Sequence, residues 1–348
     1  MKSFEIDRLK NMAVPLKIVR LISLINEYKG KEQLYIKQSP QLLNTLKEVS
    51  IIQSAESSNR IEGIYTSDKR LKEIMNNNII PNDRSEGEIA GYRDVLNTIH
   101  NGYDAIPLTE GVILQLHRDL YKYTFGSRGI WKTQDNIIEE ILSDGSKYIR
   151  FKPVDAFNTP IYMRELCERY KDEILKGEVD DLILISSFVL DFLCIHPFND
   201  GNGRMARLLT LLLLYKSGYH VGQFISLEKI IEESKESYYD TLNKSSMLWH
   251  EGNHNEFIWM EYFLGTILAA YREFENRVGV VENIKGSKSN RVEKVIENTL
   301  GYFTKEDVRK KCPDIAESTL NRVFSNLKEE GLIELVGKGR NAKWRKLK

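Results

Sequence analysis

The stretch His-Pro-Phe-Asn-Asp-Gly-Asn-Gly-Arg-Met-Ala-Arg, residues 196–207, decides how this chain of 348 residues is organised. An apolar run, 182–195, precedes it, and a second apolar run, 208–215, follows it. Pro197 fixes φ and has no N–H, so we expect the first buried helix to end near His196. A short polar loop between two buried helices holds its side chains at fixed positions, which is typical of functional loops.

Two glycines in this loop indicate an anion site. Gly201 and Gly203 permit backbone conformations that are closed to other residues, and with Asn202 between them successive N–H groups can point into one concavity. Such a nest at a helix N-terminus binds phosphate, because free N–H groups and the helix dipole both favour negative charge. Arg204 and Arg207 are three positions apart and share a helix face above the nest. The pattern therefore predicts a polyphosphate site.

The remaining polar residues of the loop supply a base and a metal ligand. His196 is the group in the loop that titrates near neutrality, so it is the natural general base. Asp200 beside the nest can hold Mg²⁺, which is commonly shared between one carboxylate and substrate phosphates. Taken singly, a histidine after an apolar run or a Gly-Asn-Gly turn is usually structural. The combination within a dozen positions favours function.

The loop resembles the signature of the Fic family (filamentation induced by cAMP), which reads His-Pro-Phe-x-Asp/Glu-Gly-Asn-Gly-Arg-x-x-Arg, and all nine specified positions match. The resemblance implies a mainly α fold: a Fic-type helical bundle with a small β-hairpin flap. It implies protein adenylylation, in which AMP passes from ATP to a Ser, Thr or Tyr hydroxyl of a target protein with His196 as the catalytic base and Asp200 holding Mg²⁺. The ATP contacts it implies are Glu62, His196, Gly201, Asn202, Gly203, Arg204, Met205, Ala206, Arg207 and Ser234.

A second stretch, 55–63, suggests regulation. Ser58 and Glu62 are four apart on one helix face, and Gly63 suits the position that ends the helix. An ordinary exposed Glu at a helix end would give the same pattern. The stretch nevertheless resembles the inhibitory motif of Fic proteins, Ser/Thr-x-x-x-Glu-Gly/Asn. That resemblance implies that Glu62 pairs with Arg207 and competes with the γ-phosphate, and that it can orient a water for removal of AMP.

Two further segments border the expected site. Asp144-Gly145, between Ile141 and Tyr148-Ile149, predicts a β-hairpin. In Fic proteins the matching flap docks the target by β-augmentation, so we expect a target protein near Tyr148–Val154. The resemblance suggests that a helix over 226–242 closes the adenine pocket. There Ser234 stands where many relatives have Asn, and Tyr238 and Tyr239 suit either that pocket or the core.

The C-terminal stretch reads as a separate unit. Residues 278–290 are polar and predict a linker. Residues 291–348 read as helix, turn, helix and a two-stranded wing, which resembles a winged helix-turn-helix. DNA binding and protein docking or dimerisation both remain open for it, and a homodimer stays an option. We therefore expect three parts: an N-terminal region with the inhibitory helix (1–108), a Fic core (109–275) and the winged helix (291–348). The side chains expected to face DNA are Ser318, Thr319, Asn321, Arg322, Ser325, Lys338, Arg340, Lys343, Arg345, Lys346 and Lys348.

Composition narrows the function classes. Fifty Lys and Arg balance fifty Asp and Glu, so global charge indicates no partner and any basic patch must be local. Three scattered cysteines fit buried thiols in a reducing compartment. The chain shows no signal-peptide pattern and no apolar run of about 20 residues, so we expect a cytoplasmic protein that does not enter a membrane. Three hypotheses remain: an autoinhibited adenylyltransferase, a phosphotransferase on the same fold, and a DNA-binding regulator with a nucleotide-sensing Fic site. Intact Asp200, Gly203 and Arg207 argue against the second.

Overall fold

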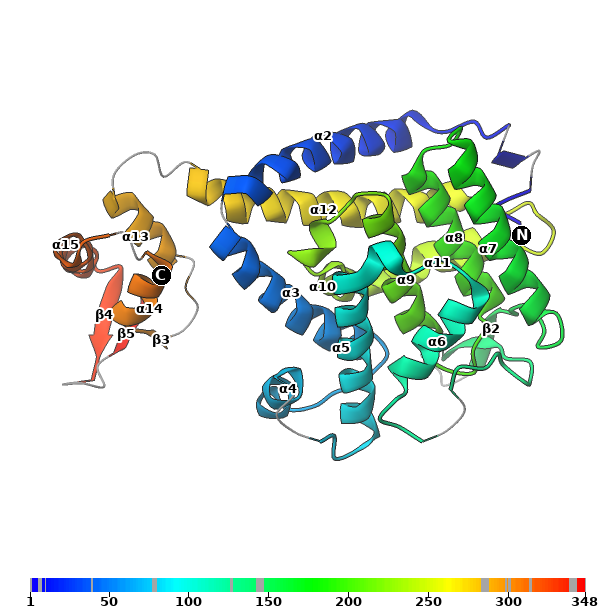
Figure 1. Ribbon diagram of the computed structural model, residues 1–348, viewed down its shortest axis with the longest axis horizontal. Coiled ribbons are helices and arrows are strands. Elements are labelled where there is room, and N and C mark those ends of the chain that lie inside the picture. The colour runs from blue at the N-terminus through cyan, green and yellow to red at the C-terminus, as the bar shows by residue number, and fades with distance from the viewer. Residues whose placement is uncertain are drawn as a thin grey trace. The chain divides into compact units, whose positions relative to one another are not determined.

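A computed structural model describes residues 2–5, 8–9, 11–38, 40–76, 80–125, 128–141, 147–282, 288–297, 299, 302–312, 315–337 and 343–347. The chain divides into two compact units, 1–274 and 275–348. Each is described by itself, and Figure 1 names their elements. Helices dominate both units, as predicted. Among the described residues no helix is long and apolar enough to cross a bilayer.

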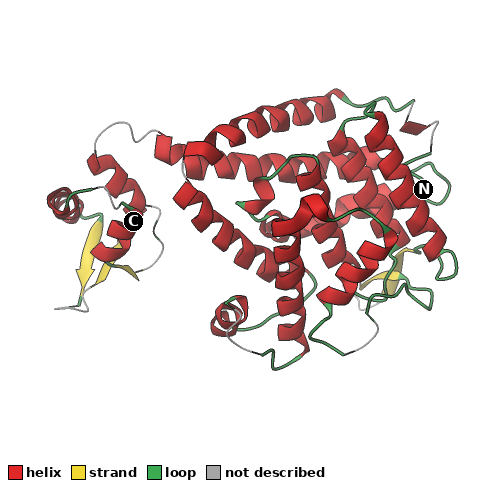
Figure 2. Cartoon of the chain, viewed as in Figure 1, coloured by secondary structure: helices red, strands yellow, loops and turns green. Residues whose placement is uncertain are grey.

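The first unit is a helical bundle with one hairpin, seen as yellow strands among red helices in Figure 2. Its elements in order are α2 (Leu16–Gln38), α3 (Pro40–Ile61), α4 (Asp68–Met75), α5 (Arg84–Gly102), η1 (Tyr103–Ala105), α6 (Glu110–Leu120), β1 (Ile138–Ile141), β2 (Lys147–Phe151), α7 (Thr159–Lys176), α8 (Asp181–Ile195), α9 (Asn202–Lys216), η2 (Val221–Gln223), α10 (Leu227–Glu233), α11 (Lys235–Ser246) and α12 (Glu256–Glu282), the last of which continues past residue 274.

Two apolar helices form the centre of this bundle. Almost every residue of α8 and α9 is buried, as expected of helices that are hydrophobic on all faces. Helix α8 packs against α7, α9 and α11, and α9 packs against α5 as well. The long helices α2 and α12 run alongside each other (Figure 1), with Tyr28 stacked on Tyr271 at a ring-centroid distance of 6.2 Å. The loop 196–201 thus joins two helices that are buried along almost their whole length.

A buried carboxylate fastens α3 to the rest of the bundle. Glu228 on α10 is 1% exposed. One of its oxygens accepts a hydrogen bond from Tyr92 Oη at 2.9 Å. The other accepts from Ser54 Oγ at 2.7 Å and from Ser226 Oγ at 3.2 Å. Because buried polar groups are stable only when they are paired, this network fixes the last turns of α3 against α5 and α10.

The predicted hairpin is present. Strands β1 and β2 are antiparallel, with Glu139 opposite Ile149. The expected turn, Asp144-Gly145, lies outside the described residues. Helix α3 ends at Ile61, which agrees with the prediction that Gly63 follows the end of this helix. The helix predicted over 226–242, in contrast, divides at Ser234. The Ser234 hydroxyl donates to Ile230 O at 2.8 Å, a bond that competes with the helical ladder.

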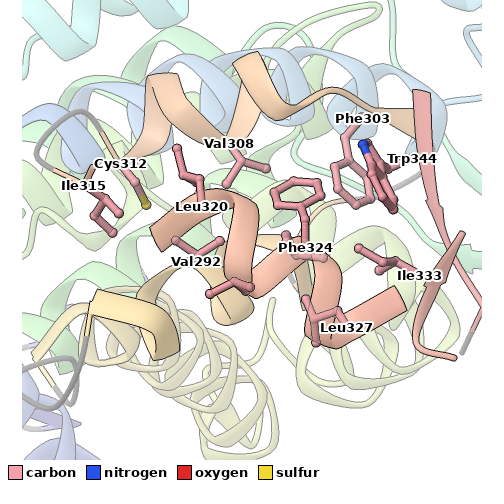
Figure 3. Packing of buried hydrophobic residues seen from close by; sticks show 12 residues of the cluster. Val292, Phe303, Val308, Cys312, Ile315, Leu320, Phe324, Leu327, Ile333 and Trp344 are labelled. Carbon is pink, nitrogen blue, oxygen red and sulfur yellow. The ribbon is translucent and has the colours of Figure 1, made fainter. Parts of the chain in front are cut away.

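The second unit has its own core. Its elements are α13 (Lys288–Glu297), β3 (Tyr302–Phe303), α14 (Lys305–Lys311), α15 (Glu317–Glu329), β4 (Ile333–Val336) and β5 (Lys343–Lys346), with the strands in the antiparallel order β3-β5-β4. Figure 3 shows Phe303 and Trp344 next to each other near the strands, and both rings contact Phe324 of α15. A capping box of Thr304 and Asp307 opens α14.

At this end of the chain, the predicted start of the linker is wrong, and the tip of the expected wing lies outside the residues that the structure describes. The predicted linker starts too early, because α12 continues to Glu282. Residues 283–287 lie outside the described part of the chain, as do 338–342 at the tip of the expected wing, with Lys338 and Arg340, and also Lys348.

Candidate functional site

His196 lies where α8 ends, as predicted. It caps the helix with a left-handed backbone, φ 51°, and its N–H donates to Phe192 O at 2.9 Å. A residue with a side chain rarely adopts this conformation, and such residues concentrate at functional sites. Nδ1 lies 3.3 Å from Leu193 O. A carbonyl only accepts, so we assign the proton to Nδ1 and leave Nε2 with a free lone pair. Burial lowers the pKa of His196 to about 4, which keeps the ring neutral at physiological pH.

Helix α9 begins at Asn202, where the sequence predicts an anion nest. Gly201 caps the helix with φ 82°, and a Cβ there would lie 2.8 Å from Tyr121 Oη, so both backbone and space require glycine. The first N–H to bond within the helix is that of Met205, to Gly201 O at 2.9 Å. The N–H groups of residues 202–204 precede it, and a helix begins with donors that have no intrahelical partner. An anion is therefore stabilised at this point.

A carboxylate occupies the mouth of this nest. A Cβ on Gly203 would lie 2.3 Å from Glu62 Oε1, so the carboxylate sits directly against the first turn of α9. The same oxygen accepts a hydrogen bond from Arg207 Nη2 at 2.7 Å. Glu62 immediately follows α3, and Gly63 ends that helix with φ 78°. The N–H of Ile64 donates back to Asn59 O at 2.9 Å, in the manner of a Schellman cap.

Arg207 is buried and held from three sides. Its Nε donates to Ser58 Oγ at 2.8 Å and its Nη2 donates to Ser58 O at 2.9 Å, besides the bond to Glu62. Its Nη1 is buried and has no hydrogen-bond partner among the residues that the structure describes. A buried donor without a partner is costly, so Nη1 marks a place where an additional acceptor would be stabilised.

Beside the nest lies a cavity of about 140 Å³. Glu62, His196 and Gly203 line one side of it, and Arg150 of β2 also faces it. The other walls are mostly apolar and come from the hairpin, α8 and α11: Ile138, Phe151, Leu190, Leu193, Cys194, Tyr238, Tyr239, Leu242, Asn243 and Ser246. A concave site with apolar walls and a few convergent polar groups is the usual form of a small-molecule site.

Arg204 and Asp200 are engaged differently from the expectation. The Arg204 guanidinium is 1% exposed, pairs with Glu88 and donates to Tyr121 Oη at 2.6 Å. Its Nη2 also lies 3.6 Å from Asp200 Oδ1. The Asp200 side chain is 56% exposed. Its Oδ2 accepts from Arg84 Nη2 at 2.8 Å and its Oδ1 from Gly201 N at 2.6 Å. In this conformation Arg204 supports the loop from behind, and Arg84 neutralises the carboxylate expected to hold a metal.

Three other expected contacts lie away from the cavity. Met205 is fully buried in the core. Ala206 lines a separate, smaller cavity of about 30 Å³ behind Arg207. Ser234 Oγ bonds Ile230 O and Tyr262 Oη at 2.8 and 2.7 Å, and Ser234 is not among the residues lining the larger cavity. Tyr238 joins the two alternatives, because it packs on Trp259 and also lines the cavity.

Sequence reasoning missed Asn243 and Arg84. Asn243 on α11 supplies an amide to the apolar end of the cavity. Nothing in its surroundings in the sequence distinguishes it from a surface residue. Arg84 had a weak signal, because it stands four residues before Glu88, the spacing of an ion pair on one helix face. His117 stacks on Phe198 with 3.7 Å between ring centroids.

Comparisons with known proteins agree with this geometry. Residues 107–214 match the Fic/DOC family. The protein adenylyltransferase VbhT of Bartonella schoenbuchensis is 24% identical over 134 residues, which are 38% of this chain and only 27% of that protein.

Two solved structures are similar over much of the chain. One is a Fic family protein from Desulfovibrio desulfuricans, with TM-score 0.62 and 19% identity, covering 96% of this chain and 97% of that one. The other is a Fic domain containing signaling protein from Bacteroides thetaiotaomicron, with TM-score 0.59 and 20% identity, covering 76% and 98%. At such identities these structures show the fold alone. The matched residues contain the end of α8, the loop and nearly all of α9, so residues 107–214 form a Fic/DOC family domain.

Proposed function

We propose that this chain is an autoinhibited protein adenylyltransferase that transfers AMP from ATP to a hydroxyl of a target protein. The observation that carries the proposal is the place of the Glu62 carboxylate. It lies at the N-terminus of α9 and accepts a hydrogen bond from Arg207. Glu62 and His196 line the same cavity. A helix N-terminus with a buried arginine is a site for an anion, and here the protein's own carboxylate takes the place that a terminal phosphate would need.

In the proposed reaction the hydroxyl oxygen of the target attacks the α-phosphorus of ATP. The bond from that phosphorus to the bridging oxygen breaks, and pyrophosphate leaves. The hydroxyl proton passes to Nε2 of His196, which is free because Nδ1 faces Leu193 O. The N–H groups at the start of α9 and Arg207 stabilise the phosphate charge. Catalysis then consists mainly of positioning and charge stabilisation.

The residues present fit a triphosphate and a magnesium ion. Arg207 Nη1 has no hydrogen-bond partner among the described residues, so it offers a phosphate a donor beyond those that bind Glu62 and Ser58. Asp200 is an exposed carboxylate beside the nest, which suits an ion that keeps most of its ligands from water and phosphate. When bound, Mg²⁺ would neutralise phosphate charge. Arg84 must first leave the Asp200 oxygen that it now occupies.

For the target protein we propose the hairpin as the docking edge, at Tyr148–Val154. Tyr148 is 57% exposed, and β1 and β2 form a sheet of two strands within the described residues. An extended peptide could add to such an edge through backbone hydrogen bonds. We place the reaction in the cytoplasm, because the three cysteines are buried and lie far apart in the sequence, which fits thiols in a reducing compartment. The orientation of a water by Glu62 for removal of AMP remains part of the proposal.

One experiment separates the transfer reactions. The Glu62→Gly protein is incubated with Mg²⁺ and ATP labelled either at the α-phosphate or at the γ-phosphate, alone and with a cell lysate. Adenylylation predicts protein-bound label from the α position alone. Label from the γ position would instead indicate phosphorylation, and label from neither, with ATP shown to bind, would contradict both.

A second candidate function concerns the C-terminal unit. Residues 275–348 contain 17 Lys and Arg against 11 Asp and Glu, which is the local positive charge that phosphate contacts require. The alternative function of the chain is that of a DNA-binding regulator whose Fic site senses nucleotide. If the C-terminal unit does not bind DNA, its other proposed role is dimerisation. Binding of duplex DNA measured at several salt concentrations tests it, because phosphate contacts predict an affinity that falls steeply with salt.

A further inference from the structure

A lysine far from the loop in sequence holds two of the loop's carbonyl groups. Lys132 precedes the hairpin, and its side chain reaches the end of α8, where Nζ donates to Ile195 O at 3.0 Å. Its backbone N–H donates to Pro197 O at 2.8 Å. The last carbonyls of a helix carry partial negative charge, so an ammonium is stabilised there.

Asn136, four residues further on, binds the carbonyls of His196 and Phe198. Its Nδ2 donates to His196 O at 3.4 Å and to Phe198 O at 3.1 Å. Its Oδ1 accepts from Lys132 Nζ at 2.8 Å, which joins the two side chains into one unit. Four successive carbonyls, from residue 195 to residue 198, are thus bound by a segment of five residues.

The cost of this arrangement argues that it serves the site. Lys132 is only 3% exposed, and lysines are rarely buried to that extent. Burial lowers the pKa of Lys132 to about 8, against the opposing effect of Asp135 and Asp155. A neutral side chain could fill the same space without this desolvation. His196, meanwhile, keeps a left-handed backbone that an isolated residue would leave.

We propose that Lys132 is a positioning residue for the transfer reaction: together with Asn136 it holds the carbonyls of residues 195–198, so that His196 stays left-handed with its ring in the cavity. This inference rests on the proposed role of His196 as base. The ammonium also acts through space on the imidazole. Lys132 disfavours protonation of His196, whereas Glu62 and Asp200, the carboxylates that face it, favour protonation.

The test uses the full chain carrying Glu62→Gly, so that inhibition does not mask the rate. Lys132→Met removes the ammonium and keeps most of the side-chain volume, and Lys122→Met, at an exposed lysine, is the matched control. Asn136→Ala is a second variant that deletes two carbonyl bonds without changing charge. We measure kcat, the Kd for ATP, and the pKa of His196 by NMR of ¹⁵N-labelled histidine, with the His196→Ala spectrum as the assignment.

We expect kcat to fall by between about tenfold and about a hundredfold in Lys132→Met and in Asn136→Ala, because a small misplacement of a reacting group has effects of that size. The Kd for ATP should stay within about twofold, and the pKa of His196 should rise in Lys132→Met. An unchanged kcat in either variant would overturn the proposal, as would an unchanged His196 pKa in Lys132→Met. The NMR result stands even if the chain proves to catalyse no transfer, so it separates this inference from the proposed function.

Discussion

Glu62 Oε1 lies 2.7 Å from Arg207 Nη2 and at the same time against Gly203, in the first turn of α9. The carboxylate thus faces a cation and a helix N-terminus together. Each of these favours a negative charge, and both are groups that a bound triphosphate would use. Under the proposed function, inhibition by this residue would require no large conformational change, because its carboxylate and a terminal phosphate would compete for one position.

Replacing Glu62 by Gly should raise self-labelling with α-labelled ATP by roughly tenfold or more, since Arg207 and the nest become available to phosphate. The substitution lies just past the end of α3, so helix stability should change little. Glu56→Gln is the matched control, because Glu56 pairs with Arg60 on the outer side of the same helix. Unchanged labelling of the Glu62→Gly protein, with ATP shown to be bound, would count against autoinhibition.

Replacing His196 by Ala in the Glu62→Gly protein should reduce transfer by about a hundredfold or more, the usual effect of losing a general base. ATP binding, measured by calorimetry, should be largely retained, because the nest and Arg207 remain. Transfer at the parent rate would remove His196 as the base. A loss of ATP binding of the same size would instead make it a binding residue.

Replacing Arg84 by Met should strengthen divalent-cation binding. Arg84 Nη2 now donates to Asp200 Oδ2 at 2.8 Å, and an exposed pair of this kind contributes little energy. We therefore expect the Kd for Mn²⁺, read by electron paramagnetic resonance with ATP present, to fall by roughly twofold to fivefold. Arg118→Met, which removes a comparable exposed partner from Asp119, should leave the Kd unchanged. Weaker Mn²⁺ binding in Arg84→Met would show that the arginine assists the site.

The stability of the first unit should fall in mild acid. Burial lowers the pKa of His100 to about 3, whereas in the unfolded chain it is about 6.5. The unfolded state therefore binds a proton that the folded state does not, and stability is lost as pH falls from about 6.5 towards 3. At pH 5 this residue lowers the free energy of unfolding by about 2 kcal/mol relative to neutral pH. Thermal unfolding of His100→Phe should show a shallower dependence on pH between 7 and 5, and an identical dependence would contradict the assignment.

Much of the site followed from local sequence. The end of α8 just before Pro197, the left-handed cap of α9 at Gly201 and the end of α3 before Gly63 are set by residues a few positions apart, and each was predicted. The contacts that tertiary structure decides were not. The residue bound by Arg204, Glu88, is 116 positions away, and no pattern near Arg204 distinguishes a partner on α5 from a phosphate. The break at Ser234 also depends on Tyr262, on a different helix.

The hydrogen bonds to Glu228 limit how much of α3 would have to move for Glu62, the proposed inhibitory residue, to leave Arg207. Ser54 is tied to that carboxylate only two turns before Glu62, whereas the residues that follow Ser58 end in the left-handed glycine. If the proposed autoinhibition holds, activation need not detach α3 from the bundle. Fraying of the last turn of α3 would be sufficient. On activation, amide hydrogen exchange should then become faster in that turn, while the amides around residue 54 stay protected.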